Sequence, residues 1–294
     1  MKVGFYPGCS LEGSSREYAE SLRAIAPIIG LDLAEVPDWN CCGASAAHNL
    51  NHKLSLALPA RVLALAEKAG LDELLVPCSA CYARLAMTQH ELLEKPELAK
   101  EIQAIIELPL TGRTRVLNAV QVLGRLASNG LAKTVTKPFA HTVACYAGCY
   151  MTRPTQVSSC ARIEDPREMD ELMKAVGAAP IDWAFKVECC GAALSVTRLD
   201  VVADLSGRIV EDAVRRGAEA IVVACPMCHT NLDLRRSAIV RSRRVKWDIP
   251  VLYVSQVIGL ALGLSERSLG LHRHAVKVRL VDKPAPAPAE VKSA

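Results

Sequence analysis

Aromatic residues, charge imbalance and long apolar runs are all scarce in this chain of 294 residues. Phe, Trp and Tyr make up 4% of the residues, which argues against a set of aromatic platforms for stacking nucleic-acid bases. The formal net charge at pH 7 is +4, so charge alone does not indicate a nucleic-acid-binding protein. The longest largely apolar stretch, Val251 to Leu264, is interrupted by Ser255 and Gln256 and is shorter than the ~20 residues of a transmembrane helix. We therefore expect no nucleic-acid partner and no membrane span.

Cysteine is the residue type present in excess, with 12 copies. The chain starts with Met1 and Lys2 and continues to Cys9 without the apolar segment and small-residue cleavage site of a secretory signal. This start favours a cytoplasmic protein. In a reducing compartment, cysteine-rich sequences more often bind metal or carry out redox chemistry than form disulfides. Metal binding is therefore the stronger hypothesis.

The cysteines follow the same order twice along the chain. Each half contains a lone cysteine, a vicinal pair followed by glycine, and a C-x-x-C motif, and corresponding cysteines are 140 to 148 residues apart. Flanking residues repeat as well: Y-P-G-C resembles Y-A-G-C, and L-N-A-V-Q-V-L-G resembles L-Y-V-S-Q-V-I-G. This agreement indicates an internal duplication. The repeated cysteines are Cys9, Cys41, Cys42, Cys78 and Cys81 in the first half and Cys149, Cys189, Cys190, Cys225 and Cys228 in the second.

Short apolar runs alternate with amphipathic helical patterns in both halves. The predicted strands are 2–6, 31–36, 73–76, 142–145 and 220–224, and the predicted helices are 16–29, 54–68, 82–94, 167–176 and 199–216. This alternation is typical of α/β folds, so we expect two repeated α/β domains with mostly parallel sheets, related by a pseudo-two-fold axis. Because ligands gather beyond the carboxyl ends of parallel strands, the cysteines that follow these strands should converge.

Composition also suggests where the repeats begin and end. An S-N-G segment followed by T-V-T-K-P separates a helical pattern from the next predicted strand, which places a boundary near 130–138. The predicted repeats are therefore 1–135 and 136–281. The Pro/Ala-rich run at 282–294 cannot fill a core, and we expect a flexible tail there.

The cysteine spacing within each repeat suits an inorganic core larger than one ion. Cysteines three apart at a helix start can reach one metal or two irons of one cluster. Vicinal cysteines diverge and are better placed to touch two atoms of a larger core, which Gly43 and Gly191 would allow the backbone to approach. A structural zinc or an ordinary iron–sulfur cluster takes four ligands, whereas each repeat offers five. Either one cysteine per repeat is not a ligand or the core is larger than a cubane; zinc in one or both repeats is the alternative.

The complete pattern is C-x31-C-C-x35-C-x-x-C followed by C-x39-C-C-x34-C-x-x-C. It resembles the duplicated cysteine-rich CCG domain found in the B subunit of heterodisulfide reductase, and the match spans Cys9 to Cys228. The resemblance implies that each repeat binds one noncubane [4Fe-4S] cluster through its five cysteines. It also implies that the two clusters face each other across the domain interface, where a disulfide substrate is cleaved or two thiols are oxidised. The spacer of 34 is one residue shorter than is usual in the family.

The same resemblance implies partners, because these proteins work in multisubunit complexes and this chain lacks the ferredoxin run C-x2-C-x2-C-x3-C-P. A ferredoxin-like iron–sulfur protein, the C-type component of heterodisulfide reductase (Hdr), and a flavoprotein, its A-type component, are expected. Similar repeats occur in the Hdr-like complexes of sulfur-oxidising prokaryotes and in lactate, glycolate, succinate and fumarate oxidoreductases. We predict an oxidoreductase subunit that acts on disulfides, thiols or another sulfur substrate. The alternative is an electron-relay or zinc-stabilised assembly subunit of such a dehydrogenase, without a substrate of its own.

The remaining polar residues carry weaker hypotheses. Cys145 and Cys160 lie outside the repeated pattern, and Cys145 is expected to be a small buried residue at a strand end. His229, beside the second C-x-x-C, could donate to a cluster sulfur, although a solvent-facing helix start is the commoner role. His48 and His52 could contribute to a zinc site, with a solvated helix start as the simpler interpretation. The basic run could meet an anionic substrate or an acidic partner, with a solvated surface as the usual interpretation; it consists of Arg235, Arg236, Arg241, Arg243 and Arg244.

Overall fold

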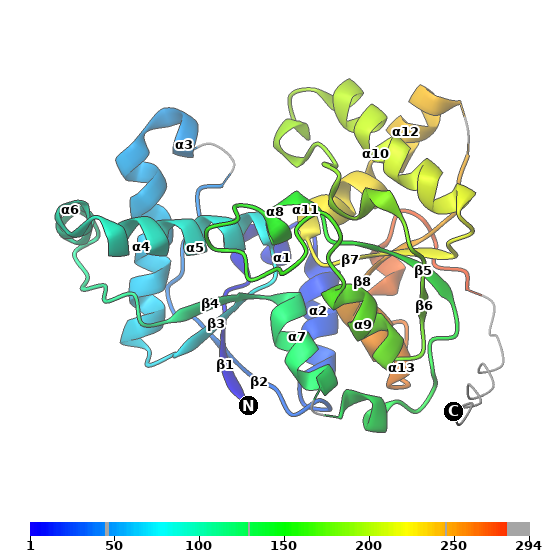
Figure 1. Cartoon of the computed structure of the whole chain (residues 1–294), viewed down its shortest axis with the longest axis horizontal. Coiled ribbons are helices and arrows are strands. Elements are labelled where there is room, and N and C mark those ends of the chain that lie inside the picture. The colour runs from blue at the N-terminus through cyan, green and yellow to red at the C-terminus, as the bar shows by residue number, and fades with distance from the viewer. Residues whose placement is uncertain (45–46, 129, 245, 281–294) are drawn as a thin grey trace.

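Two parallel sheets organise the part of the chain that the computed structural model describes, which is residues 1–44, 47–128, 130–244 and 246–280 (Figure 1). The strand order is β2-β1-β3-β4 in the first sheet and β6-β5-β7-β8 in the second, so the two halves share one topology. The prediction of two repeated α/β units with parallel sheets is therefore confirmed. The strands are β1 Lys2–Phe5, β2 Asp32–Glu35, β3 Glu73–Val76, β4 Arg115–Asn118, β5 Thr142–Tyr146, β6 Ala179–Pro180, β7 Ala220–Val223 and β8 Val251–Tyr253.

Helices connect the strands and cover both sheets. No helix in the described ranges is long and apolar enough to cross a bilayer. In the first half the helices are α1 Gly8–Glu12, α2 Arg16–Ile25, α3 Ala47–Leu50, α4 His52–Lys68, α5 Ser79–Glu94, α6 Pro96–Ile106 and α7 Ala119–Ser128. In the second half they are α8 Cys149–Thr152, α9 Glu168–Ala175, α10 Leu199–Arg215, α11 Pro226–His229, α12 Arg236–Arg243 and α13 Val254–Ala261, with a π turn, η4, at Thr230–Leu234. Short 3-10 turns are η1 Leu131–Thr134, η2 Ala184–Val187, η3 Ala192–Leu194 and η5 Leu271–Arg273.

The predicted elements agree with these bounds to within a few residues, with two kinds of difference. The helix predicted at 16–29 ends at Ile25 as α2, because Pro27 has no N–H with which to continue the helical hydrogen bonds. The strands β4, β6 and β8 were not predicted, because each is short and β4 and β8 run directly into a helix. The boundaries 1–135 and 136–281 stay a prediction, and the tail predicted at 282–294 lies outside the described residues.

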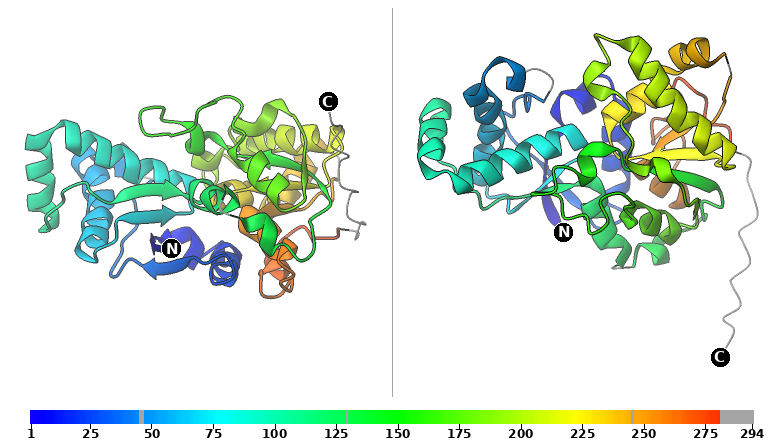
Figure 2. Two further views of the ribbon diagram at one scale, coloured as in Figure 1. Left: turned by 60° about the horizontal axis from the view of Figure 1, so that its bottom comes forward. Right: turned by 45° about the horizontal axis from the view of Figure 1, so that its top comes forward.

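The two halves pack through reciprocal pairs of helices. The second α-helix of each half packs on the last α-helix of the other half: α2 contacts α13, and α9 contacts α7. The helices that carry the cysteines also make reciprocal contacts between the halves: α5 contacts α8, and α1 contacts α11. Reciprocal pairing of this kind is what a pseudo-two-fold axis produces. Figure 2 shows the result from two further directions, with α4 and α6 at the end of the molecule farthest from the second sheet.

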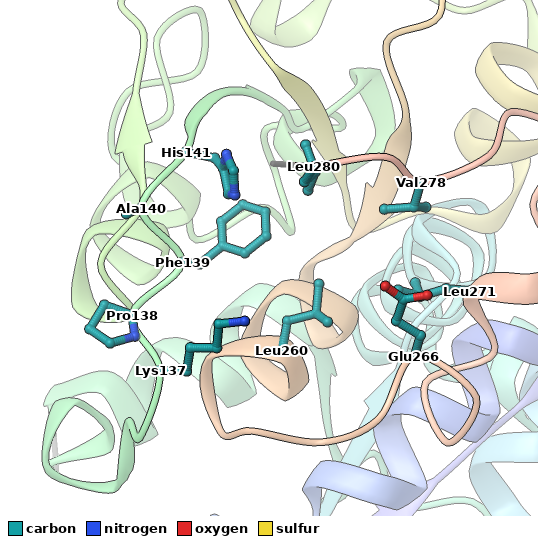
Figure 3. Close-up of a pocket in the computed structure, with 10 residues that line it drawn as sticks. All are labelled: Lys137, Pro138, Phe139, Ala140, His141, Leu260, Glu266, Leu271, Val278 and Leu280. Carbon is teal, nitrogen blue, oxygen red and sulfur yellow. The ribbon is translucent and has the colours of Figure 1, made fainter. Parts of the chain in front are cut away.

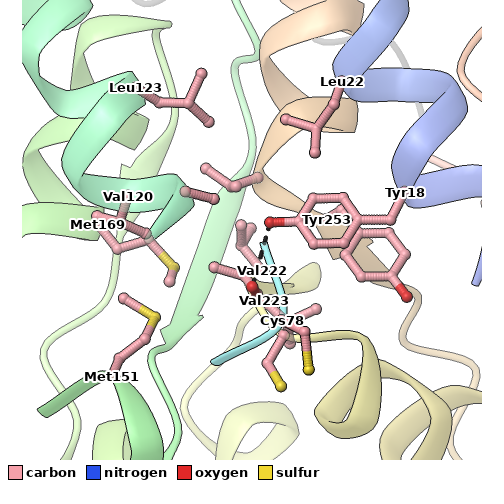
Figure 4. Packing of buried hydrophobic residues seen from close by; sticks show 14 of the residues in the cluster. Tyr18, Leu22, Cys78, Val120, Leu123, Met151, Met169, Val222, Val223 and Tyr253 are labelled. Atoms are coloured by element: carbon pink, nitrogen blue, oxygen red, sulfur yellow. Dashed lines mark hydrogen bonds between the residues drawn. The ribbon is translucent and has the colours of Figure 1, made fainter. Parts of the chain in front are cut away.

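Buried aromatic rings fasten this junction. Tyr18 of α2 stacks on Tyr253 at a centroid separation of 4.1 Å, and its hydroxyl donates to the Ala224 carbonyl oxygen at 3.2 Å (Figure 4). Nearby, the hydroxyls of Ser21 and Ser255 are 2.7 Å apart. The core cluster runs without interruption from one sheet to the other, so the halves form one packed body in the described part of the chain.

Candidate metal centres

The ten repeated cysteines lie at the carboxyl ends of the strands, where the sequence predicts them. Cys9 is in α1, directly after β1, and Cys149 begins α8 after β5. Cys78 and Cys225 follow β3 and β7 and precede the first residues of α5 and α11. The vicinal pairs lie in the loops after the edge strands β2 and β6. One structural rule therefore brings both sets to the same side of their sheets.

Within the first set the thiols are close together. The Cys42 and Cys81 sulfurs are 3.0 Å apart, and the Gly43 N–H donates to the Cys41 sulfur at 3.4 Å. Hydrogen bonds from the Cys41 and Cys81 thiols lower the pKa of Cys42, so this sulfur is the one favoured as a thiolate. Cys42, Cys78 and Cys81 are buried, whereas Cys9 and Cys41 are exposed.

The second set repeats this arrangement. The Cys190 and Cys228 sulfurs are 3.6 Å apart, and the Gly191 N–H donates to the Cys189 sulfur at 3.3 Å. A hydrogen bond from the Cys149 thiol, together with backbone N–H groups, lowers the pKa of Cys189 to about 6. Each half therefore holds at least one thiol that is poised to ionise, and the thiolate is the form that binds metal.

The two sets meet at the junction between the halves. Cys78 of the first set and Cys225 of the second are both buried, and each thiol shifts the pKa of the other. The Cys225 thiol raises the pKa of Cys78, and the Cys228 and Cys78 thiols lower the pKa of Cys225. Figure 4 shows Cys78 below the Tyr18 and Tyr253 rings at this junction. The expected convergence is therefore present in the structure.

The chemistry of the donors fits iron–sulfur clusters. All twelve cysteines belong to the described residues and none forms a disulfide. The 3.0 and 3.6 Å sulfur separations are longer than a disulfide bond of ~2.05 Å. Clusters of paired, partly buried thiols with backbone N–H groups directed at sulfur are the usual ligands and hydrogen-bond partners of iron–sulfur clusters.

Two pairs of glycines contact the thiols in different ways: the Gly43 and Gly191 N–H groups donate to sulfur, whereas the side of Gly148 and Gly8 that lacks a Cβ faces sulfur. Gly43 and Gly191 have positive φ angles, +73° and +80°, but a Cβ added to Gly43 would meet Leu58 of α4 at 2.8 Å, and one added to Gly191 would meet α10. These glycines are required by backbone conformation and helix packing. In contrast, a Cβ at Gly148 would lie 3.1 Å from the Cys228 sulfur, and one at Gly8 would lie 3.5 Å from the Cys81 sulfur. The repeated Y-x-G-C motif is the signal that could have identified them.

The tyrosine of the same Y-x-G-C motif forms a hydrogen bond to the loop that holds the vicinal cysteines. The Tyr6 hydroxyl donates to the Asn40 carbonyl oxygen at 2.8 Å, and the Tyr146 hydroxyl donates to that of Glu188. Asn40 and Glu188 each precede a vicinal cysteine pair. Burial and the neighbouring thiols raise the pKa of both tyrosines, so they stay protonated donors. Each tyrosine therefore ties the vicinal loop to the end of its central strand.

The weaker sequence hypotheses have mixed outcomes. Cys145 is buried in β5, as expected, and the Cys160 thiol lies beside the Glu168 carboxylate at 3.8 Å. His52 is exposed and pairs with Glu91 at 3.3 Å, and nothing is described for the side chain of His48. The solvent-facing interpretation of His229 is wrong: its ring is buried and stacks on Tyr253.

The basic run is only partly a solvated surface. Arg236 is buried and donates to the carbonyl oxygens of Leu232, Trp247 and Ile249, so the surface interpretation is wrong for this residue. Such a side chain ties η4 to the segment before β8. Arg243 is half-buried and pairs with acidic residues of α10. Arg241 and Arg244 are exposed, as expected, and Arg235 is half-buried.

The buried residues His229, Asp233 and His274 are hydrogen-bonded to neighbouring residues, although the His274 Nδ1 has no partner in the described structure. The Gln256 amide nitrogen donates to the His274 Nε2 at 2.8 Å, since the Gln256 oxygen already accepts the Tyr253 N–H. The Asp233 carboxylate accepts two backbone N–H groups, and the His229 Nε2 lies 3.1 Å from the Val251 carbonyl oxygen. Because the His274 lone pair is occupied, we assign no cation here.

Two pockets on the protein surface differ in how near they lie to the cysteines in the sequence. The pocket in Figure 3, about 190 Å³, is lined by residues 137–141 and by Leu260, Leu271 and other C-terminal residues, without a cysteine. A groove of about 310 Å³ between α4, α5 and α8 is lined by Ala80 and Tyr150, which are sequence neighbours of Cys81 and Cys149. No cysteine lines this groove itself, but two of its lining residues are next in sequence to a cysteine of each set.

Comparisons with known proteins point in the same direction. A model of the CCG family, described as a cysteine-rich domain, matches residues 3–86 and 143–233. A protein named 8-methylmenaquinol:fumarate reductase membrane anchor subunit, from Wolinella succinogenes, is 30% identical over 277 residues, covering 94% of this chain and 97% of that protein. The B subunit of ferredoxin:CoB-CoM heterodisulfide reductase from Methanosarcina mazei is 29% identical, covering 94% of each chain.

A further relative and a solved structure complete the comparison. A protein of Archaeoglobus profundus, described as like the B subunit of heterodisulfide reductase, is 28% identical and covers 90% of this chain and 91% of its own length. The crystal structure of a hypothetical protein from Helicobacter pylori superposes with a TM-score of 0.78 over 95% of this chain and 53% of that one. At 14% sequence identity, the latter likeness concerns the fold alone.

Proposed function

Because this chain belongs to the CCG cysteine-rich domain family and is similar to the B subunits of heterodisulfide reductases, we propose that it is the redox subunit that holds two noncubane [4Fe-4S] clusters and cleaves or forms a disulfide between them. The ligands would be the five thiols of each set. The observation that carries the proposal is that the cysteine-bearing helices of the two halves contact each other, α5 with α8 and α1 with α11, with Cys78 and Cys225 buried at the junction.

The bound clusters would supply electrons and iron sites for thiolate sulfur. The protein provides the surroundings. Tyr18 and Tyr253 close one side of the junction and keep water from Cys78 and Cys225, which are at most 3% exposed. The groove lined by Ala80, Met87 and Tyr150 lies beside the sequence neighbours of Cys81 and Cys149, and we propose it as the path for a disulfide or thiol.

Partners are part of the proposal. In the described structure the buried thiols of both sets lie at one junction, and the chain has no ferredoxin motif for moving electrons away. A ferredoxin-like iron–sulfur protein, with a flavoprotein in the same complex, would complete the route. The named heterodisulfide reductases among the relatives are described as subunits, which supports a complex of this kind.

The decisive measurement is the metal content of anaerobically purified protein. About eight irons and a matching amount of acid-labile sulfide per chain are expected for two four-iron clusters. About four irons would mean that only one repeat holds a cluster and would remove the two-cluster mechanism. Stoichiometric zinc with little iron would refute the proposal altogether. Electron paramagnetic resonance of the partly reduced protein should contain two separable signals.

A second candidate function rests on the relative from Wolinella succinogenes, which is named as part of a fumarate reductase. Under this alternative, the chain relays electrons for a dehydrogenase and has no disulfide substrate. Purification of the native complex separates the two. Association with a flavin-containing fumarate or succinate dehydrogenase, without disulfide reductase or thiol oxidase activity, would favour the relay; activity on a disulfide or thiol would favour the leading proposal.

A further inference from the structure

The two sites share a scaffold but differ at the third residue after the C-x-x-C motif. Both halves have the glycine N–H bond to a vicinal sulfur, the anchoring tyrosine and the paired thiols. At the third position the first half has Arg84, which lines the groove beside α4 and α8. The second half has Asn231, which is fully buried in the π turn η4. Single π turns inside helices are frequent at functional sites.

Asn231 is fixed by contacts on both ends of its amide. The amide nitrogen is 3.0 Å from the Cys190 carbonyl oxygen and 3.6 Å from the Cys190 sulfur. The amide oxygen accepts the Ser195 hydroxyl at 2.8 Å. The opposite orientation would place two oxygens against each other at Cys190, so the nitrogen is the atom that faces the sulfur. Within the described residues, no other side-chain amide has a hydrogen bond to a cysteine sulfur.

A hydrogen bond of this kind acts on the redox equilibrium of whatever the sulfur holds. An N–H donor stabilises negative charge on a thiolate, and reduction adds negative charge to a cluster and its ligands. The donor therefore favours the reduced state and raises the reduction potential. Because Asn231 is fully buried, solvent does not screen the effect. Arg84 is half-buried at a groove, where water weakens the influence of its charge.

We propose that Asn231 makes the two clusters unequal, so that the cluster of the second repeat is reduced first. This inference rests on the proposed function, since it requires a cluster in each repeat. Asn231 acts through Cys190 and is a positioning residue. When two electrons enter the protein, the first should therefore reduce the second-repeat cluster and the second should reduce the first-repeat cluster.

The test is a redox titration of the anaerobic protein followed by electron paramagnetic resonance. In Asn231→Leu, the midpoint potential of one cluster should shift to a more negative value while that of the other is unchanged. The matched control is Ser206→Ala, because the Ser206 hydroxyl bonds the same Cys190 carbonyl oxygen at 3.0 Å but not the sulfur. Both midpoints should stay in place in the control.

A second measurement needs no variant. Protein labelled with ¹⁵N in its asparagine side chains should give a nitrogen hyperfine coupling in pulsed electron paramagnetic resonance, on the signal of the cluster that is reduced first. Because the Asn40 amide also lies beside a first-repeat cysteine, coupling confined to the later-reduced cluster, or no coupling at all, would overturn the inference even if Asn231→Leu loses iron. Unmoved midpoints in a variant with full iron content would also overturn it. About four irons in the wild-type protein would instead reject the proposed function, so the two failures are distinguishable.

Discussion

The buried lysine beside the second site gives the sharpest stability prediction. Lys186 lies in η2, three residues before Cys189, with a side chain that is 1% exposed. Its ammonium donates to the Asp170 carboxylate at 2.6 Å, to Asp165 at 2.8 Å and to a backbone carbonyl, which uses its three protons. The Asp170 side chain is 4% exposed, and its Oδ1 has no hydrogen bond. Replacing the lysine would therefore leave a buried carboxylate without its cation.

Lys186→Met should cost about 3–5 kcal/mol of unfolding free energy, the usual effect of removing one partner of a buried pair. At roughly 2–4 °C per kcal/mol, the thermal midpoint should fall by ~6–20 °C. Circular dichroism of the anaerobic protein measures this. The matched control is Lys174→Met, because Lys174 pairs with Glu171 on an exposed surface, where such pairs contribute only about 0–1 kcal/mol.

The double variant Lys186→Met/Asp170→Leu separates charge from packing. Replacing both partners by apolar residues removes the stranded carboxylate, so at least half of the loss should be recovered. No recovery, or a single-variant effect no larger than that of the exposed control, would refute the buried-pair argument. Because the Lys186 carbonyl also accepts the Gly148 N–H at 3.0 Å, the single variant should lose iron from the second repeat first.

The pH dependence of this effect follows from the shifted pKa values. Burial lowers the pKa of Lys186, but the Asp165 and Asp170 carboxylates outweigh it and leave the pKa raised, so its contribution is lost only as pH rises beyond the ordinary lysine range. The Lys186 ammonium lowers the pKa of Asp165, so that contribution is lost only as pH falls through the acidic range. The contribution of this ion pair to wild-type stability should therefore be constant from about pH 5 to 9.

Two further predictions concern the thiols directly. Gly148→Ala should remove the second-repeat cluster and leave about four irons per chain, since the new Cβ would lie 3.1 Å from the Cys228 sulfur; Gly30→Ala, with a similar φ of +69° and open space, is the control and should keep full iron content. Cys42→Ser or Cys190→Ser should each abolish one paramagnetic signal and preserve the other, because each half holds its own thiols; unchanged iron in both variants would contradict the five-ligand assignment.

Much of the site could be predicted from the sequence because its chemistry is periodic. Ten cysteines in two registers identify the duplication, and the rule that ligands gather at strand ends predicts that Cys78 and Cys225 approach the same region. What the pattern could not provide is the contact itself, which depends on how α2 packs on α13 and α5 on α8. Those faces are apolar and resemble any other helix face in sequence.

The residues whose roles could not be predicted from the sequence were missed for one physical reason: their roles depend on contacts that local sequence does not encode. Gly148 and Gly43 look equivalent in sequence, since each flanks a cysteine, and only the direction of the absent Cβ shows which one faces sulfur. His229 and Arg236 look like surface residues because polar side chains usually are. Burial instead follows from partners far along the chain, such as the Ile249 carbonyl oxygen, that no local pattern contains.

The duplication also explains where the two sites are free to diverge. The thiols, the Y-x-G-C loops and the vicinal loops are held in common, so a change there would disturb a shared geometry. The turn after C-x-x-C carries no such constraint. Tyr82 reaches across to the Val157 carbonyl oxygen, whereas its counterpart His229 turns into the core of its own half beside Val251. Two residues further along the same turn, Asn231 meets a sulfur. The proposed difference between the two clusters therefore arises in the turn after C-x-x-C, where the two repeats can differ without disturbing their cysteine ligands.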